Sequence, residues 1–323
     1  MRRIVCRELG PLDRLVEEDA PDLTPAPDQV VVAVRAAGVN YVDALFVQGG
    51  YQIKPPLPFT PGSEIAGQVV AVGDAVQGVG VGDRVAASVG LGGYAEQVAV
   101  PAASVLPLPA GLSFGRAAAM VQSYATALFA LTRRTTVREG ETVLVLGAGG
   151  GVGLATIDVA RSLGLDPIAA ASSDAKLAAA RAAGARGTID YESEDLKTRA
   201  RELGGGGVDV VVDPVGGRWA EPALRALAVG GRYLVIGFAG GEIPRLPINH
   251  ILLNNRTVVG VDWGAWAMQN PGDNQALVAD LMAAVAAGRL HPPEPASYPL
   301  ADAAGALADL QARRVVGKLV LEP

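Results

Sequence analysis

The sequence predicts an α/β protein in which a β-rich domain is interrupted by a doubly wound parallel-sheet domain. Three observations predict this fold. Short strand-like runs fill the first third of the chain, buried strands alternate with helices from Glu141 onward, and the C-terminal strand-like run cannot extend that alternation. Alternating strands and helices indicate a parallel sheet covered on both faces. A chain of 323 residues has the length expected of two domains.

The first third of the chain carries short apolar runs separated by glycine, proline and aspartate turns. Such runs are typical of strands in a small barrel or an irregular sandwich. The expected strands are Gln29–Ala37, Glu64–Val72, Val81–Ala86 and Tyr94–Val100.

The character of the chain changes at Ser113, a good helix N-cap residue that precedes Ala-rich sequence. Beyond it, the final run Gly317–Leu321 is a strand that we expect to rejoin the first domain. Residues 1–121 and 262–323 would then form one domain, and residues 122–261 the inserted one. The inserted domain's expected strands are Thr142–Gly147, Asp166–Ala171, Gly187–Tyr191, Val208–Asp213, Arg232–Gly237 and Thr257–Val261; the expected helices are Gly153–Leu163, Asp174–Ala183, Trp219–Leu227 and, after the insert, Asn274–Ala287.

Composition excludes several classes of protein. A lone cysteine, Cys6, forms no intramolecular disulfide, and together with His250 and His291 it offers no zinc-ligand spacing. The charge of 27 minus 33, or −6, gives no electrostatic reason to expect nucleic acid. No signal-peptide core and no run of about 18 apolar residues is present. We expect a soluble cytoplasmic protein with no membrane or nucleic-acid partner.

The strongest chemical signal is a glycine-rich turn that follows a strand and opens a helix. Ala148, Gly150 and Gly153 occupy the spacing of a dinucleotide-binding fingerprint, with Gly151 and Val152 between them. Small residues there let the backbone turn tightly, and free amides at the helix N-terminus attract a pyrophosphate. We therefore expect this turn to bind a dinucleotide.

The end of the second strand bears on which dinucleotide is bound. A carboxylate there binds the ribose hydroxyl of NAD, whereas a basic residue accommodates a 2′-phosphate. This strand ends in Ser172 and Ser173, and Lys176 follows. Two hydroxyls and an ammonium favour NADPH. Asp174 argues the other way, because its carboxylate would repel a phosphate, and the serines could simply cap the next helix.

Three stretches of the chain carry a resemblance to a known family. They are Ala37–Asp43, Pro61–Gly67, and the glycine turn with the downstream Ser172, Lys176 and Tyr191. Over essentially its whole length, the chain resembles the zinc-independent quinone oxidoreductases, the zeta-crystallin-like branch of the medium-chain dehydrogenase/reductases. The resemblance implies a GroES-like β-rich catalytic domain with an inserted NADP-binding Rossmann domain.

Metal ligands of the family's zinc-dependent members are missing from this chain. Those relatives carry Cys in the early loop and His in a Gly-His-Glu turn, whereas this sequence has Asn40 and Asp43 in the early loop and Ser63 in the turn. The resemblance therefore implies that no metal is bound. Leu45 also stands where some members have a second tyrosine, so a proton-donor role for that tyrosine does not transfer.

The resemblance also implies the site residues. Asn40 and Tyr51 would lie near the nicotinamide and the substrate carbonyl, and they are the candidate catalytic hydrogen-bond donors, with water supplying the proton. The implied cofactor-binding positions are Asn40, Asp43, Gln122, Thr126, Ala148, Gly150, Gly151, Val152, Gly153, Ser172, Ser173, Lys176, Tyr191, Asp213, Val215, Gly237, Phe238 and Ala239.

The expected function is hydride transfer from NADPH to a quinone or related conjugated carbonyl. A 2-enoyl-thioester or alkenal reductase of the same fold is one alternative, because the acceptor depends on the cleft around Tyr51, Leu45 and Trp266. A non-catalytic, crystallin-like NADPH-binding protein is a second. Family members pair the last strand of the Rossmann sheet across a two-fold axis, so we expect a homodimer through Thr257–Val261.

Overall fold

The computed structural model describes all 323 residues, which divide into two compact units. Unit 1 comprises Met1–Gln122 and Pro293–Pro323, and unit 2 comprises Ser123–Pro292. The first boundary falls within one residue of the expected one, but the second lies after Pro292 rather than after residue 261. Helices α8 (Trp263–Gln269) and α9 (Pro271–Ala286) account for the difference, because the Trp263 indole donates to Asn274 and α8 packs on unit-2 residues.

Unit 1 is built around a seven-stranded sheet whose longest strand is β3. The order is β14-β15-β3-β4-β5-β7, and β6 also pairs with β3; a separate two-stranded sheet joins β1 to β2. The inward residues of these strands form one apolar core with helix α10. The strands are β1 (Arg2–Val5), β2 (Val16–Asp19), β3 (Gln29–Val39), β4 (Glu64–Val72), β5 (Arg84–Ser88), β6 (Gln97–Pro101), β7 (Val105–Pro107), β14 (Ala296–Pro299) and β15 (Leu319–Glu322).

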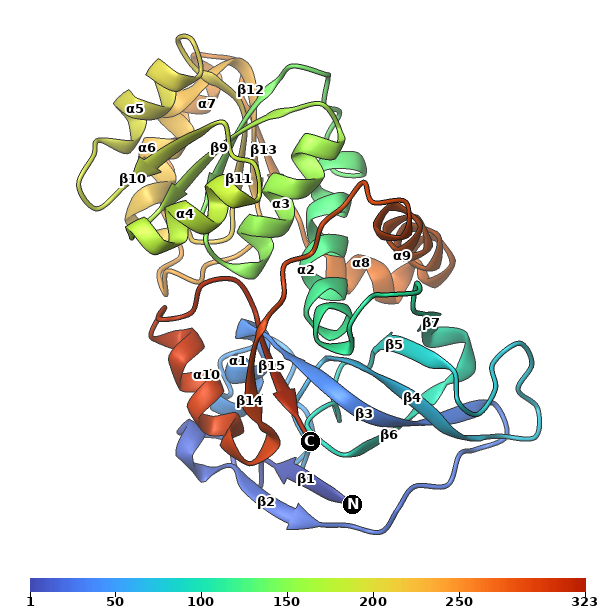
Figure 1. The fold of residues 1–323 in the computed structure, drawn as a ribbon. Coiled ribbons are helices and arrows are strands. Elements are labelled where there is room, and N and C mark those ends of the chain that lie inside the picture. Colours follow the sequence, from blue (N-terminus) through green and yellow to red (C-terminus); the bar gives the residue numbers. More distant parts are fainter. The chain divides into compact units, whose positions relative to one another are not determined.

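The C-terminal strand β15 lies in the sheet of unit 1, as expected from the sequence. It pairs antiparallel with β3, and Leu319 stands opposite Val39. This register places Lys318, the residue before β15, beside the end of β3. Figure 1 shows β15 alongside β3, although the two strands lie at opposite ends of the chain.

Unit 2 is a six-stranded, all-parallel sheet in the order β10-β9-β8-β11-β12-β13. The chain runs outward from β8 through β9 to β10, and then returns to run from β11 through β12 to β13. Since parallel crossovers are right-handed, this reversal places helices on both faces of the sheet. The strands are β8 (Thr142–Leu146), β9 (Asp166–Ala171), β10 (Gly187–Asp190), β11 (Val208–Asp213), β12 (Leu227–Val235) and β13 (Thr257–Gly260).

Helices cover the unit-2 sheet and link the remaining elements (Figure 1). Helix α2 begins where Ser113 Oγ accepts a hydrogen bond from the Arg116 amide, so the predicted N-cap is confirmed. The helices not yet given are α1 (Tyr41–Gln48), α2 (Phe114–Thr132), α3 (Gly151–Ser162), α4 (Asp174–Ala182), α5 (Leu196–Leu203), α6 (Ala220–Ala226), α7 (Asn249–Leu252) and α10 (Ala303–Gln311); four single 3₁₀ turns occur at Leu12–Arg14, Ala102–Ser104, Gly217–Trp219 and Leu300–Asp302.

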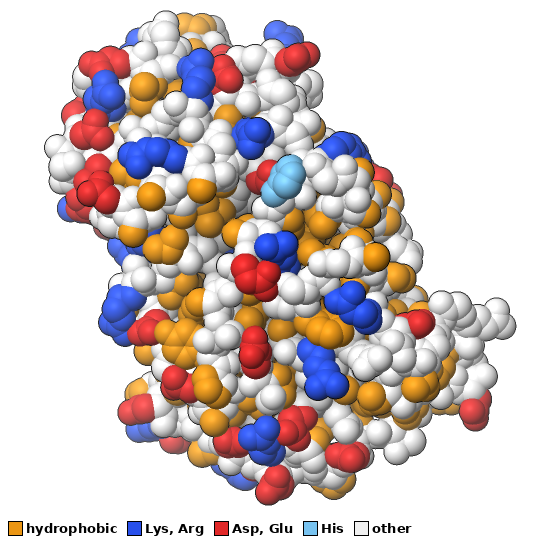
Figure 2. All heavy atoms as spheres, in the orientation of Figure 1, with side chains coloured by type: hydrophobic (Ala, Val, Ile, Leu, Met, Phe, Trp, Pro, Cys, Tyr) orange, Lys and Arg blue, Asp and Glu red, His pale blue; other side chains and the backbone are white.

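Charged side chains of both signs cover the surface. No helix combines the length and the hydropathy that crossing a membrane requires. On the face drawn in Figure 2, basic and acidic side chains lie interspersed over both units. Many of them form exposed ion pairs, such as Arg186 with Asp166 and Arg218 with Glu192. Exposed pairs of this kind contribute at most about 1 kcal/mol each.

Candidate functional site: a dinucleotide cradle and a buried polar cluster

The unit-2 sheet has a topological switch point between β8 and β11, where the chain reverses its direction across the sheet. In open parallel sheets, ligands bind beyond the carboxyl ends of the strands at such a point. Two turns flank it, the glycine turn after β8 and the turn that begins at Asp213 after β11. They lie in contact, because a Cβ added to Gly147 would come within 2.8 Å of Val215 Cγ2.

The glycine turn leaves a row of backbone amides open. Gly150 is the N-cap of α3, and the amides of Gly151, Val152 and Gly153 make no hydrogen bond within the chain. At Gly153 a Cβ would lie 2.4 Å from the Gly147 carbonyl oxygen, so a side chain there would push the turn and helix apart. Open amides at the N-terminus of a twelve-residue helix fit a phosphate group.

Lys176 lies beside this turn, on the first part of α4. Its stem packs against Gly149, where an added Cβ would come within 2.4 Å of Lys176 Cβ. Its Nζ donates to Ser172 Oγ at 3.3 Å. Ser173 is the N-cap of α4, although its side chain makes no capping hydrogen bond. The ammonium and the hydroxyls that the sequence predicts at a 2′-phosphate site are therefore brought together at one edge of the sheet.

Asp213 stabilises the turn that follows β11. Its Oδ1 accepts from the amides of Val215 at 2.7 Å and Gly216 at 2.8 Å, and its Oδ2 accepts from the Tyr233 hydroxyl. Burial raises the pKa of the Asp213 carboxyl above its ordinary value despite these donors. This carboxylate shapes the wall of the cradle through its neighbours, and its oxygens already have partners within the chain.

Two strand-end loops bond to each other beside Asp213. The Gly237 amide donates to the Asp213 carbonyl at 3.3 Å, and the Ala239 amide donates to the Pro214 carbonyl at 3.0 Å. Phe238 remains 37% exposed on the outer side of this pair of loops. The turn Gly237–Ala239 thus lies next to the turn that follows β11.

Tyr191 follows β10 and is buried against Trp219, with ring centroids 4.5 Å apart. The Arg218 guanidinium lies 4.4 Å above the centroid of the Trp219 ring. Tyr191 follows β10, two strands away from β8 in the sheet order, whereas Trp219 follows β11, the strand next to β8.

Unit 1 holds a second group of predicted residues at the start of α1. The sequence placed Asn40 and Asp43 in a loop; they are instead the N-cap and the third residue of a helix. Asp43 Oδ2 accepts from the Asn40 amide at 2.9 Å, one half of a capping box. This exchange explains why a helix begins at Asn40, and it directs the Asn40 amide group into the interior.

A buried ion pair anchors the same place. Lys318 Nζ lies 3.0 Å from Glu64 Oε1, with the two side chains 10% and 1% exposed. The ammonium also donates to the Val39 carbonyl at 3.0 Å and to Asn40 Oδ1 at 2.5 Å. Removing either partner would leave a buried charge unpaired, which costs about 3–5 kcal/mol.

Asp43 sits behind this pair in a fully buried position. Burial raises the pKa of its carboxyl to about 6, against the opposing effects of the Asn40 amide, the Tyr94 hydroxyl and Lys318. Tyr94 donates to Asp43 Oδ2 at 3.0 Å, and burial raises the pKa of that phenol. Asp43 Oδ1 has no hydrogen-bond partner. Asp43 lies under Asn40, with no exposed surface to offer a cofactor.

Helix α2 supplies Gln122 and Thr126. Asn40, Ser63, Glu64 and Lys318 form a buried polar cluster, here called the unit-1 cluster. Gln122 belongs to it, because its backbone amide donates to Glu64 Oε2 at 2.9 Å and its Oε1 accepts from Ser63 Oγ at 3.1 Å. Thr126, one turn later, is buried in unit 2. Tyr51 follows α1 and packs edge-on against Phe46, with ring centroids 4.8 Å apart.

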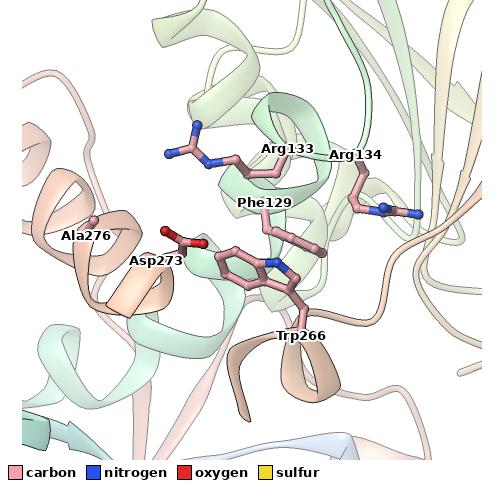
Figure 3. A pocket seen from close by; sticks show the side chains of 6 residues that line it. All are labelled: Phe129, Arg133, Arg134, Trp266, Asp273 and Ala276. Atoms are coloured by element: carbon pink, nitrogen blue, oxygen red, sulfur yellow. The ribbon is translucent and has the colours of Figure 1, made fainter. Parts of the chain in front are cut away.

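Unit 2 also contains a cavity of about 470 Å³ between α2, α8 and α9. Trp266 lies against Phe129, with ring centroids 4.6 Å apart, and forms part of the wall of this cavity. Figure 3 shows the Asp273 carboxylate and the Arg133 guanidinium facing the same space above the indole, while Arg134 extends away from it. Trp263 is buried beneath α9 instead.

The donor set of unit 1 does not fit zinc. No group of three or more His, Cys, Asp or Glu side chains is arranged to hold a metal ion. Asn40 and Ser63 bond to each other at 3.2 Å, and the Lys318 ammonium occupies the remaining face of the Asn40 amide. Zinc prefers thiolate, imidazole and carboxylate ligands, whereas Asn40 and Ser63 offer an amide and a hydroxyl, and the Lys318 ammonium beside them would repel the cation.

The remaining single residues lie apart from these groups. Burial raises the pKa of the Cys6 thiol, which donates to the Glu8 carbonyl. His291, which has no acidic partner nearby in sequence, pairs with Asp158 across the fold: its amide donates to that carboxylate at 2.6 Å. His250 lies on the short helix α7.

Lys318 and Tyr94, which bond to the residues at the start of α1, were not predicted as site residues from the sequence. Lys318 was expected only as part of the strand Gly317–Leu321, and Tyr94 only as part of the strand Tyr94–Val100. No local pattern links Lys318 to Asn40, since 278 positions separate them. Only the register of β15 on β3 brings them into contact. The Ser63-Glu64 pair was a usable signal, because a polar dipeptide begins an otherwise apolar strand.

Comparison with known proteins agrees with this architecture. The family model described as "Alcohol dehydrogenase GroES-like domain" matches residues 26–110, and the one described as "Zinc-binding dehydrogenase" matches residues 151–283. The second description names a zinc-binding family, whereas unit 1 brings together Asn40, Ser63 and Lys318 rather than a group of His, Cys, Asp or Glu side chains arranged for a metal ion.

Relatives and solved structures match the chain over its full length. Quinone oxidoreductase-like protein 2 of Bos taurus is 39% identical over 99% of this chain and 92% of its own. The crystal structure of a Pseudomonas syringae quinone oxidoreductase has a TM-score of 0.91 at 35% identity, covering 100% and 99% of the two chains. That of Escherichia coli quinone oxidoreductase complexed with NADPH has a TM-score of 0.90 at 29% identity, covering 100% of each. The chain belongs to the quinone oxidoreductase branch of the medium-chain dehydrogenase/reductase superfamily.

Proposed function

We propose that this protein is an NADPH-dependent oxidoreductase that reduces a quinone or a related conjugated carbonyl without zinc. The observation that carries the proposal is the glycine turn at the switch point of the unit-2 sheet. Its three open amides stand beside Lys176 and Ser172, so one edge of the sheet offers donors for a pyrophosphate and a cation for a further phosphate.

The residues present fit NADPH. When bound, NADPH supplies the hydride, and the protein's task is to hold and orient it. The amides of Gly151, Val152 and Gly153 would bind the pyrophosphate. Lys176 with Ser172 and Ser173 would bind the 2′-phosphate, and Tyr191 would lie toward the adenosine. The E. coli and mycobacterial relatives whose structures contain NADPH support this assignment.

Reduction of a conjugated carbonyl places negative charge on an oxygen, and this charge needs a hydrogen-bond donor. The unit-1 cluster contains amide and hydroxyl groups but no arrangement of ligands that suits a metal. We therefore assign the stabilisation of that oxygen to neutral donors and to water. The names of the relatives, quinone oxidoreductases in several organisms, support a quinone as the acceptor.

Steady-state oxidation of NADPH with a panel of acceptors tests the proposal. The panel would contain 1,4-benzoquinone, 9,10-phenanthrenequinone, crotonyl-CoA and 2-hexenal. We expect the quinones to give the highest kcat/KM. Turnover of crotonyl-CoA or 2-hexenal alone would replace the quinone with an enoyl thioester or an alkenal. Tight NADPH binding with no turnover of any acceptor would contradict the enzymatic function itself.

A further inference from the structure

The hydrogen bonds of the unit-1 cluster form a connected series that begins at the Lys318 ammonium. The three hydrogens of its ammonium go to the Val39 carbonyl, Asn40 Oδ1 and Glu64 Oε1. Both hydrogens of Asn40 Nδ2 are also used, one toward Glu64 Oε1 at 2.9 Å and one toward Ser63 Oγ at 3.2 Å. Asn40 therefore has no hydrogen left for a substrate in this arrangement.

The chain of bonds continues to Gln122 and ends there. Ser63 Oγ donates its hydrogen to Gln122 Oε1 at 3.1 Å. The Gln122 backbone amide donates to Glu64 Oε2, which holds the start of the helix in place. Gln122 Nε2 has no acceptor within the chain, and the side chain is only partly buried. Its two hydrogens are the only amide or hydroxyl hydrogens of the cluster left open.

The orientation of each amide follows from its neighbours. Asn40 must turn its oxygen to the Lys318 ammonium and its nitrogen to the Glu64 carboxylate, since the reverse would bring donor against donor and acceptor against acceptor. Ser63 then accepts from Asn40, so its own hydrogen needs an acceptor. Gln122 Oε1 supplies one, which leaves Nε2 pointing away from the cluster.

All three hydrogen bonds of this series run in the same direction, from the Lys318 ammonium to the open amide of Gln122. Lys318 donates to Asn40, Asn40 to Ser63, and Ser63 to Gln122. Hydrogen bonds aligned in one chain polarise one another, most strongly where water is excluded. A buried ammonium at the head of the chain makes the last N–H more acidic and therefore a better donor.

We propose that Gln122 Nε2 donates the hydrogen bond to the acceptor's carbonyl oxygen, and that Lys318 polarises this donor through Asn40 and Ser63. The inference rests on the proposed function and moves the donor from Asn40 to Gln122. In the reaction, the C–H bond of NADPH breaks and its electron pair forms the new bond on the acceptor. NADPH becomes NADP⁺, the oxyanion is held by Gln122, which keeps its proton, and water protonates the product. Gln122 is a catalytic residue in this scheme, whereas Asn40, Ser63 and Lys318 are positioning residues.

Substitutions at Gln122 provide the first test. Gln122→Met keeps the length of the side chain and removes both hydrogens, and Gln122→Glu keeps the acceptor for Ser63. In single-turnover reactions with NADPH and 1,4-benzoquinone, we expect either variant to slow hydride transfer by about tenfold to a hundredfold. The dissociation constant for NADPH should change by less than about threefold. Gln68→Met, which removes a side-chain amide that donates to the Gly82 carbonyl in a solvent-exposed bond of unit 1, is the matched control.

Substitutions at Lys318 provide the second test. Lys318→Met combined with Glu64→Gln removes both buried charges together, so neither is left unpaired. We expect a smaller loss of rate than at Gln122 and a steeper dependence of the rate on the reduction potential of substituted benzoquinones. A merely structural role for Lys318 would not change that dependence. Lys318→Arg should restore most of the rate, because it returns a cation to the head of the chain.

The outcomes separate the inference from the proposed function. If the wild-type protein reduces quinones and Gln122→Met does so at the same rate, the inference is wrong and the proposed function stands. A folded Lys318→Met/Glu64→Gln variant with the wild-type dependence on reduction potential would remove Lys318 from the scheme. If the wild-type protein reduces no conjugated carbonyl, both the proposed function and the inference fall.

Discussion

Lys176 is the residue on which the choice of dinucleotide depends. Its Nζ lies 3.3 Å from Ser172 Oγ, beside the glycine turn. An ammonium bonded to a phosphate contributes about 1.5–3 kcal/mol, so Lys176→Ala should weaken NADPH binding about tenfold or more. NADH lacks the 2′-phosphate and should lose less than about twofold. Fluorescence titration of both nucleotides measures the two losses.

Arg181→Ala is the matched control for Lys176. Arg181 lies on the same helix, near its other end, and bonds to Thr188 rather than to the turn. We expect it to leave both affinities unchanged. Equal losses of NADPH and NADH in Lys176→Ala would remove Lys176 from the phosphate site.

Asp43 gives the protein a pH-dependent stability. Its folded pKa of about 6 lies above the ordinary value of 3.8, so the folded state binds the proton more tightly than the unfolded state. The resulting stabilisation is complete below pH 3.8 and is lost as the pH rises through 6. Asp43→Asn cannot ionise. The free energy of unfolding of the wild-type protein should therefore fall by about 2–3 kcal/mol relative to Asp43→Asn between pH 4 and pH 7.5. Urea denaturation at both pH values measures this, and a difference that does not vary with pH would contradict it.

Among the elements that build the candidate site, the glycine turn leaves no room for a side chain at Gly153. A Cβ at Gly153 would lie 2.4 Å from the Gly147 carbonyl oxygen and 2.7 Å from Ala148 Cα, both of them backbone atoms. We expect Gly153→Ala to reduce the free energy of unfolding by about 2 kcal/mol through overpacking. Gly272→Ala on α9 has open space around the added Cβ, and it should be neutral or slightly stabilising. Chemical denaturation compares the two variants, and equal midpoints would show that the turn tolerates a side chain.

Buried strands were predicted well from the sequence, because a continuous apolar run has few other places in a fold. The bounds of β4, β9 and β11 match the expectation residue for residue. Strand β5 begins three residues later than expected and β6 begins at Gln97, because turns at their N-terminal ends hold the preceding residues.

Short helices were predicted poorly. Helix α1 was taken as a loop, since its start depends on the hydrogen bond from the Asn40 backbone amide to the Asp43 carboxylate rather than on apolar periodicity. Helix α5 went unnoticed because its mean hydropathy is low and only Leu196 and Ala200 are buried. Strand β12 begins at Leu227, inside the expected helix, because Leu227 pairs with Val208.

The candidate site could also be predicted from the sequence only in part. The glycine turn between β8 and α3 could be predicted, because its residues directly follow one strand in sequence. The unit-1 cluster could be predicted only in part, since Lys318 reaches Asn40 through pairing between distant strands. The polarity of the hydrogen-bond chain, and with it the open Nε2 of Gln122, requires the arrangement of all its members in space.

At the scale of the whole molecule, β13 is an edge strand, paired on one side only with β12. Val258 on this strand is 38% exposed, and Ile248, Leu252 and Leu253 shortly before it are each more than 70% exposed. An unpaired edge beside exposed apolar side chains favours association. We predict a homodimer in which β13 pairs with its counterpart across a two-fold axis.

Light scattering after size exclusion tests the dimer. The wild-type protein should have about twice the mass of one chain, and Val258→Glu should be a monomer because like charges would meet near the axis. Val81→Glu, at a valine of unit 1 that is 68% exposed, should remain dimeric. A monomeric wild-type protein, or a dimer that Val258→Glu leaves intact, would contradict this interface.

The proposed reaction is the transfer of a hydride from NADPH to a quinone without a metal. The most direct measurement is NADPH oxidation with 9,10-phenanthrenequinone by protein dialysed against a chelator, with its metal content determined by mass spectrometry. We expect full turnover with less than about one zinc ion in ten chains, and no increase in the rate of NADPH oxidation when zinc is added. Activity that disappears on dialysis and returns with zinc would contradict it.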